Sequence, residues 1–162
     1  MNAQADTQQD VDLALESFLA EGGTFAMLKG VSAEELEQLY TMAYGYYQSG
    51  KLEEAQTVFK GLCVLNHYDS RFFLGLGACR QALKHYDLAI QSYVYGALVD
   101  IKEPRFPFHA AECHLQSGDL TAAESGFYSA HALAQACPGQ DDLAARAALM
   151  LEHVVTQRRN EP

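Results

Sequence analysis

The 162-residue sequence has no apolar run near the roughly 20 residues that a membrane-spanning helix requires. Its first twelve residues carry acidic side chains but no lysine or arginine, unlike a secretory signal peptide. It also lacks a Cys-x-x-Cys pair, a nucleophile elbow and a His-Glu-x-x-His motif. We therefore expect a cytoplasmic protein that does not insert into membranes and is not an enzyme.

Basic residues are scarce as well. Eleven lysines and arginines stand against 21 acidic residues, which gives a formal net charge of −10. Because binding to phosphate groups requires clusters of lysine and arginine, this balance argues against DNA, RNA and anionic membranes as partners.

The cysteine and histidine residues do not form a recognisable metal site. His109, Cys113 and His114 lie close together in the sequence, but they offer only three candidate ligands. Cys113 also follows Cys79 by 34 residues, which indicates a packing position rather than a ligand. We expect no metal, no other cofactor and no disulfide, with reduced thiols at the four cysteines: Cys63, Cys79, Cys113 and Cys137.

What the sequence does contain is a repeat of 34 residues. Small residues, aromatic residues and aliphatic residues each recur at this interval. The columns include Ala55, Ala89 and Ala123; Phe59, Tyr93 and Phe127; Leu39, Phe73 and Pro107; and Ala43, Gly77 and Ala111. Small residues let two helices approach closely, and the aromatic residues fill the space between successive repeats. This spacing is the signature of the tetratricopeptide repeat (TPR).

The repeats predict an all-α fold with three tandem helix hairpins that form a right-handed superhelical solenoid. The frames are 36–69 for the first repeat, 70–103 for the second and 104–137 for the third. Residues 1–31 should form an N-terminal tail and helix, and 140–157 a C-terminal capping helix. All of these segments belong to one domain.

Local signals agree with the frames. Ser32 and Glu35 form a capping box at the start of the first repeat. Gly50 and Gly118 stand where the first helix of a hairpin turns into the second, and glycine adopts the left-handed backbone there at no cost. Lys84 occupies the equivalent place in the second repeat and departs from the pattern.

The N-terminal segment carries an apolar stripe at helical spacing. Two interpretations remain open for it: a cap packed on the first repeat, or a contact between two copies of the chain. The residues predicted for the dimer contact are Leu15, Phe18 and Leu19.

In TPR proteins the first helices of the hairpins line a concave face, where ligands lie. Three tyrosines of the first repeat share one helix face, and neighbouring columns such as Leu39, Met42 and Ala43 already supply the core. The predicted peptide-binding groove consists of Tyr40, Tyr44, Tyr47, Gln48, His67, Arg71, Leu74, Ala78, Gln81, Arg105, Phe108 and Glu112. The Lys and Asn residues that clamp an acidic C-terminal tail are missing from these places.

Four stretches carry more than a general TPR pattern: 15–24, 40–51, 66–80 and 103–113. Through them the chain, over roughly residues 10–155, resembles the class II chaperones of bacterial type III secretion, the translocator chaperones of the LcrH/SycD type. The resemblance implies a cytoplasmic chaperone that binds two hydrophobic translocator proteins and keeps them soluble and apart before export. It also implies a groove for an extended segment with proline and leucine anchors, and a homodimer formed through the N-terminal region. The alternative function is a TPR adaptor that joins folded partner proteins in a regulatory complex.

Overall fold

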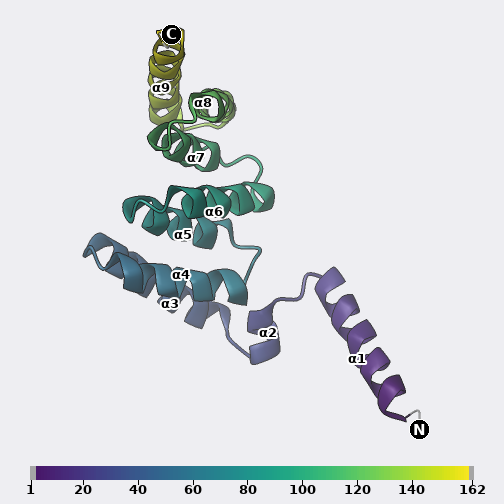
Figure 1. Ribbon diagram of the computed structural model, residues 1–162. Helices are drawn as coiled ribbons and strands as arrows, with labels where there is room; N and C mark the ends of the chain where they lie inside the picture. Colours follow the sequence, from purple (N-terminus) through teal and green to yellow (C-terminus); the bar gives the residue numbers. More distant parts are fainter. Residues whose placement is uncertain (1–2, 161–162) are drawn as a thin grey trace.

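The computed structural model describes residues 3–160 of the chain, and side-chain surroundings from residue 11 onward. Over the described residues the chain forms helices and no strands (Figure 1). The helices are α1 (Ala3–Ala20), α2 (Phe25–Lys29), α3 (Ala33–Gln48), α4 (Leu52–Leu65), α5 (Ser70–Ala82), α6 (Tyr86–Val99), α7 (Arg105–Gln116), α8 (Leu120–Ala136) and α9 (Asp141–Arg159).

Three antiparallel hairpins, α3–α4, α5–α6 and α7–α8, stack on one another, and α9 follows at the end of the stack (Figure 1). The all-α TPR solenoid expected from the 34-residue period is therefore confirmed. Within the described part of the chain, no helix is both long enough and apolar enough to cross a membrane.

The residues of the repeat columns hold the hairpins together. The three alanines at 34-residue intervals are fully buried, and the aromatic residues four places later are also buried, at 1% exposure or less. One close approach is at Gly77, where a Cβ atom would lie 2.3 Å from the ring of Tyr93. The small residue is thus required because the aromatic side chain of the next helix occupies the space that a side chain at position 77 would need.

The turns inside the hairpins share a left-handed residue. Gly50 and Gly118 have φ angles of 78° and 82°, and Lys84 has a φ of 62°. Lys84 thus keeps the backbone geometry of the other two repeats without the glycine that normally provides it. A side chain in this conformation costs about 1–2 kcal/mol, so the middle turn is the strained one.

The helix starts follow the signals in the sequence. The backbone N–H of Glu35 donates to Ser32 Oγ (3.2 Å), and the backbone N–H of Ser32 donates to Glu35 Oε2 (2.8 Å), which completes the capping box. Asp69 caps α5 by accepting from the N–H of Arg71, and Asp119 caps α8 by accepting from the N–H of Ala122.

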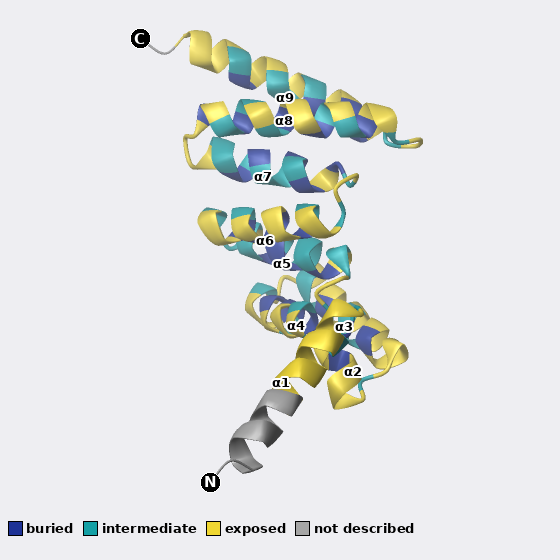
Figure 2. Ribbon diagram, turned by 90° about the vertical axis from the view of Figure 1, so that its right-hand side faces the viewer, coloured by how far each residue is buried: buried dark blue, intermediate teal, exposed yellow. Residues whose placement is uncertain are grey.

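The C-terminal helix covers the last hairpin. Leu143, Ala147 and Val154 of α9 are buried against the core that α8 also lines, whereas the outer face of α9 is exposed (Figure 2). The helix ends at Arg159, two residues beyond the end expected for the cap.

The N-terminal helix stands apart. Within the described residues α1 packs against no other helix, and Figure 1 shows it extending away from the solenoid. The part of the N-terminal segment that packs on the first repeat is α2, which contacts α4 and buries Ala26, and not α1. Leu15 and Leu19 are exposed on α1, while the ring of Phe18 lies over Gly23, which has no side chain to clash with it. The left-handed residue in the turn towards α2 is Gly22, with a φ of 87°.

Candidate peptide-binding groove

The first helices of the three hairpins, α3, α5 and α7, together form a pocket of about 260 Å³. Seven of the residues predicted for the groove line it: Tyr40, Tyr44, Tyr47, Arg71, Leu74, Ala78 and Arg105. The 34-residue period brings them together because equivalent places of successive repeats face the same side of the solenoid.

The three tyrosines differ in how far they are exposed. Tyr44 is 49% exposed and stacks on Tyr40 with 6.5 Å between ring centroids. Tyr40 also packs against Phe59 and Phe72, at 6.0 and 5.9 Å. Tyr40 therefore belongs both to the pocket wall and to the core, contrary to the expectation that the tyrosines lie outside the core.

Tyr47, like Tyr40, is half-buried. It packs against the core cluster that includes Phe59 and Phe72. Burial, together with the nearby Cys79 and Tyr44, raises the pKa of the Tyr47 hydroxyl, so this group stays protonated and can donate a hydrogen bond to a ligand. Met42, expected in the core, is instead exposed.

Arg71 stands at the junction of the first and second repeats. Its guanidinium is held by Asp69, with Nη2–Oδ2 at 2.6 Å, and by Glu37, with Nη2–Oε1 at 2.5 Å. Hydrogen bonds to Asp69 and then to Glu37 raise the pKa of Arg71. The guanidinium is therefore permanently charged and fixed in orientation at the pocket.

Arg105 repeats this arrangement 34 residues later. Its Nη2 donates to Glu103 Oε2 (2.7 Å), and its backbone N–H donates to Glu103 Oε1 (3.1 Å). The side-chain hydrogen bond from Arg105 lowers the pKa of Glu103. Each arginine is thus oriented by an acid two residues before it, and the pocket carries two positive groups in an otherwise acidic protein.

A network of polar side chains continues the groove between the second and third repeats. The hydroxyl of Tyr93 donates to Gln81 Oε1 (2.7 Å), and Gln81 Nε2 donates to Glu112 Oε2 (3.0 Å). His109 Nδ1 lies 2.8 Å from the same carboxylate oxygen. Because a carboxylate can only accept, the His109 Nδ1 atom carries the proton.

Glu112 is the centre of this network. Burial raises its pKa, but hydrogen bonds from His109 and Gln81 outweigh that effect, and the pKa is lowered overall. Gln81 and Glu112 line a separate hollow of about 310 Å³ rather than the tyrosine pocket. The predicted groove is therefore two adjoining hollows connected by His109.

Three of the predicted groove residues lie elsewhere. Phe108 is only 1% exposed and packs edge-to-face on Phe127, so it is a core residue. Gln48 is exposed and lines none of these hollows. His67 lies in the loop between α4 and α5 and lines a different, apolar hollow. The spacing of Phe108 matched the groove pattern, but its ring lies towards α8, where it contacts Phe127.

The structure adds three residues to the pocket that the sequence did not indicate: Phe59, Gly75 and His109. Gly75 and His109 are 34 residues apart, so the period itself was the available signal for both. A side chain at position 75 would clash with Phe59, because a Cβ atom there would lie 2.3 Å from the ring. Glycine at this position therefore lets the ring of Phe59, which belongs to α4, reach the pocket.

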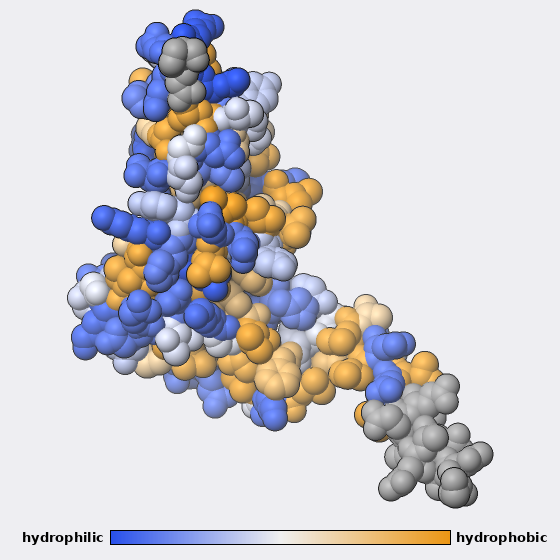
Figure 3. Space-filling view, in the orientation of Figure 1, coloured by the Kyte–Doolittle hydropathy of each residue, from blue (hydrophilic) through white to orange (hydrophobic). Residues whose placement is uncertain are grey.

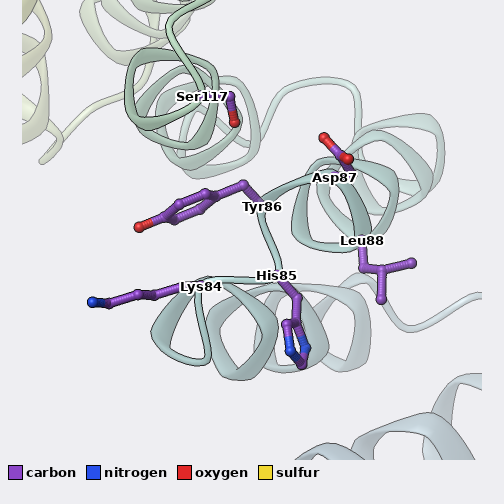
Figure 4. Close-up of a pocket in the computed structure, with 6 residues that line it drawn as sticks. All are labelled: Lys84, His85, Tyr86, Asp87, Leu88 and Ser117. Atoms are coloured by element: carbon purple, nitrogen blue, oxygen red, sulfur yellow. The ribbon is translucent and has the colours of Figure 1, made fainter.

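A further depression of about 330 Å³ lies at the turn between α5 and α6, next to the end of α7. Figure 4 shows Lys84 and Tyr86 extending to one side while His85 and Leu88 point away from them. These groups do not converge on a common point, so the depression does not have the form of a catalytic or ligand site.

No group of three or more potential metal ligands occurs within the described part of the chain. The four cysteines carry free thiols, and Cys79 and Cys113 are buried. Burial raises the pKa of Cys79 to about 11 and that of Cys113 to about 12. Such thiols remain protonated near neutral pH and are poor nucleophiles and poor metal ligands.

Comparison with known proteins agrees with this geometry. Residues 36–69 match the family model described as tetratricopeptide repeat. Low calcium response locus protein H of Yersinia pseudotuberculosis is 56% identical over 161 residues, which cover 99% of this chain and 96% of that protein.

Two solved structures are similar along most of their length. A type III secretion complex from Aeromonas hydrophila contains a chain with a TM-score of 0.89 and 60% identity, covering 91% of this chain and 99% of that one. PcrH, a Pseudomonas aeruginosa protein, was solved with the chaperone-binding region of PopD; its TM-score is 0.79 at 63% identity, covering 80% of this chain and 97% of that one. The chain therefore belongs to the family of type III secretion translocator chaperones that includes LcrH and PcrH, which are chaperones and not enzymes.

Proposed function

We propose that this protein is a cytoplasmic chaperone that binds two hydrophobic translocator proteins of a type III secretion system. It holds an extended segment of each client in the groove, and so keeps the clients soluble and apart until export. The observation that carries this proposal is the pocket in which three tyrosines of α3 face two oriented arginines of α5 and α7.

The chemistry of the pocket suits an extended peptide. The tyrosine rings offer apolar surface to proline and leucine side chains at a low cost in conformational entropy, and their hydroxyls can bond to the peptide backbone. The backbone carbonyls of an extended segment have no internal partners, so they can accept hydrogen bonds from the guanidinium N–H groups of Arg71 and Arg105 that Asp69, Glu37 and Glu103 do not occupy. The binding of the PopD region by PcrH supports the same role for this related chain.

The acidic composition supports the same function. A client that later enters a membrane is apolar enough to aggregate in water, and a carrier with a net charge of −10 keeps the complex soluble. We further propose that two copies of the chain associate through α1, where Leu15 and Leu19 are exposed and Phe18 supports the turn to α2. The client and the second copy would then occupy different parts of the chain.

Calorimetric titration with a peptide of the chaperone-binding region of PopD tests the proposal directly. We expect saturable 1:1 binding per chain, and co-expression should bring full-length PopD into the soluble fraction. A protein that binds neither the peptide nor full-length PopD would refute the proposal. A protein that captures only folded proteins, without making PopD soluble, would be an adaptor.

A further inference from the structure

The hollow next to the tyrosine pocket combines one charged group with apolar side chains. It encloses about 310 Å³, and its lining consists of Gln81, Tyr86, Glu112, Leu115, Gln116 and Met150. Of the described residues that line it, only Glu112 carries a formal charge at neutral pH. A carboxylate beside apolar walls favours a ligand that is apolar along its length and cationic at its end.

This hollow continues the face of α7 that lines the tyrosine pocket. Arg105 and His109 of α7 line the pocket. Glu112 and Gln116 of the same helix line the hollow, and steps of four, three and four residues put all four on one face. His109 Nδ1 also lies 2.8 Å from Glu112 Oε2, so the two sites touch. Because three helical residues rise only about 4.5 Å, a long side chain of a peptide in the pocket can reach the hollow.

The carboxylate of Glu112 has one oxygen that is still available. Oε2 accepts from Gln81 Nε2 (3.0 Å) and contacts His109. Oε1 accepts no hydrogen bond from the described residues, and its cationic neighbour, Arg146 Nη2, is 3.9 Å away. Although burial raises it, hydrogen bonds from His109 and Gln81 lower the pKa of Glu112 overall, so the carboxylate is ionised near neutral pH. Oε1 is therefore a charged acceptor that lacks a donor.

Arg146 of α9 does not supply that donor. Its guanidinium carbon lies 4.7 Å from the centre of the Phe108 ring, and its side chain is 60% exposed. An ion pair so exposed, at a separation beyond hydrogen-bond distance, contributes little. The Arg146 side chain can move into solvent when a closer cation reaches Glu112.

We propose that the hollow at Glu112 binds a lysine or arginine side chain of the client, next to the segment held in the tyrosine pocket. The methylene stem lies against Leu115 and Met150, and the cationic head donates to Glu112 Oε1. This inference rests on the proposed chaperone function. Arg71 and Arg105 repel the same cation from the tyrosine pocket, so the two hollows together favour one register of the client in the groove.

The general charge of the protein does not give this selectivity. Figure 3 shows hydrophilic residues over much of the visible face of the solenoid, and the chain has 21 acidic residues against 11 basic ones. Exposed acids attract a basic client side chain weakly at many places, and salt screens that attraction. The hollow instead predicts a preference for a cation at one place in the client sequence.

The test uses peptides of the chaperone-binding region of PopD in which each position in turn is replaced by lysine or by methionine, an uncharged side chain of similar length. Calorimetry gives the affinity of each pair for the wild type and three variants. Glu112→Gln removes the charge of the hollow. Gln116→Lys supplies an internal cation four residues after Glu112, a spacing at which the two side chains pair on a helix. Glu54→Gln, at an exposed residue of α4, is the control for net charge.

We expect the lysine peptide to bind wild type at least fivefold more tightly than its methionine partner at one position, or at two neighbouring ones. The preference should fall below twofold in Glu112→Gln and in Gln116→Lys, and persist in Glu54→Gln. The inference is overturned if no position prefers lysine, if the preference survives in either hollow variant, or if Glu54→Gln abolishes it too. Gln116→Lys retains the hydrogen bonds around Glu112, so it decides the question whatever the fold of Glu112→Gln. If the wild type binds no peptide of the series, the proposed function itself fails.

Discussion

The guanidinium carbon of Arg71 lies 5.0 Å from the centre of the Tyr40 ring, so a cation from the second repeat covers an aromatic residue of the first. Asp69 and Glu37 hold the guanidinium in this position from either side. This contact joins two repeats at the tyrosine pocket and orients both of its partners before a peptide arrives. Binding then loses less conformational entropy than it would with free side chains.

The exposed tyrosine of the pocket should affect binding far more than stability. Tyr44→Ala removes a half-exposed ring, and we expect the free energy of unfolding to fall by less than about 1 kcal/mol. The affinity for the PopD peptide should fall more than tenfold, or about 1.4 kcal/mol, because aromatic anchors dominate such interfaces. Calorimetry and thermal melts of the same variant measure both quantities.

Tyr40→Ala should behave differently, because its ring packs on Phe59 and Phe72 as well as facing the pocket. It should lose both affinity and about 2–4 kcal/mol of stability. The control is Tyr128→Ala, which removes an exposed ring of α8 and should leave both unchanged. Equal stability of the Tyr40 and Tyr44 variants would contradict this division between core and pocket.

Gly77 should tolerate no side chain. A Cβ atom there would lie 2.3 Å from the ring of Tyr93, a fully buried residue that cannot move aside. We expect Gly77→Ala to destabilise the protein by about 1–3 kcal/mol in urea unfolding. Gly61→Ala is the matched control: that helical glycine has open space around it, so alanine should stabilise α4 by up to about 1 kcal/mol.

The strained turn at Lys84 offers a stabilising substitution. Its φ of 62° matches the glycines of the other two hairpin turns, so Lys84→Gly should raise the free energy of unfolding by about 1 kcal/mol. Gly50→Ala, at the equivalent place of the first repeat, should lower it by a similar amount. Chemical denaturation of the two variants measures both changes, and a destabilised Lys84→Gly protein would show that the lysine side chain has a role beyond the turn.

Glu112 should make the protein sensitive to acid. Its pKa lies below the ordinary value of 4.5 in the folded chain, so its stabilising effect is complete above that pH and is lost as the pH falls through the folded pKa. Glu112→Gln should therefore be less stable than wild type by about 1–2 kcal/mol at pH 7. The difference should shrink as the pH falls from 4.5 through the lowered pKa of Glu112, as measured by denaturation across the pH range. A difference that does not vary with pH would mean that the carboxylate charge is unimportant.

The exposed leucines of α1 should control self-association. Replacing Leu15 and Leu19 together by Asp should yield a monomer with unchanged helical circular dichroism, because α1 packs on no other helix of the described chain. Sedimentation equilibrium gives the mass. Phe18 is left intact because its ring lies over Gly23 and supports the turn to α2. An unchanged mass for the double variant, or a wild-type protein that is monomeric at high concentration, would rule out this contact.

Much of the fold was readable from the sequence because the constraints are local or periodic. Ser32 and Glu35 cap α3 through residues three apart, and the 34-residue interval aligns Arg71 with Arg105 in the same pocket. Phe108 shows where this reasoning fails. Its place in the repeat suggested the groove, but the direction of its ring depends on how α7 packs on α8.

The sequence by itself determined the number of hairpins, their turns and the helix face from which the groove is built, because these follow from residues that are neighbours or repeat at a fixed interval. Only the tertiary structure decided that Tyr40 belongs partly to the core, that α1 packs on no other helix of the described chain, and that His67 lines an apolar hollow instead of the groove. These outcomes depend on how side chains distant in the sequence pack, or fail to pack, on one another. Such packing is the sum of many contacts, and no single spacing in the sequence records it.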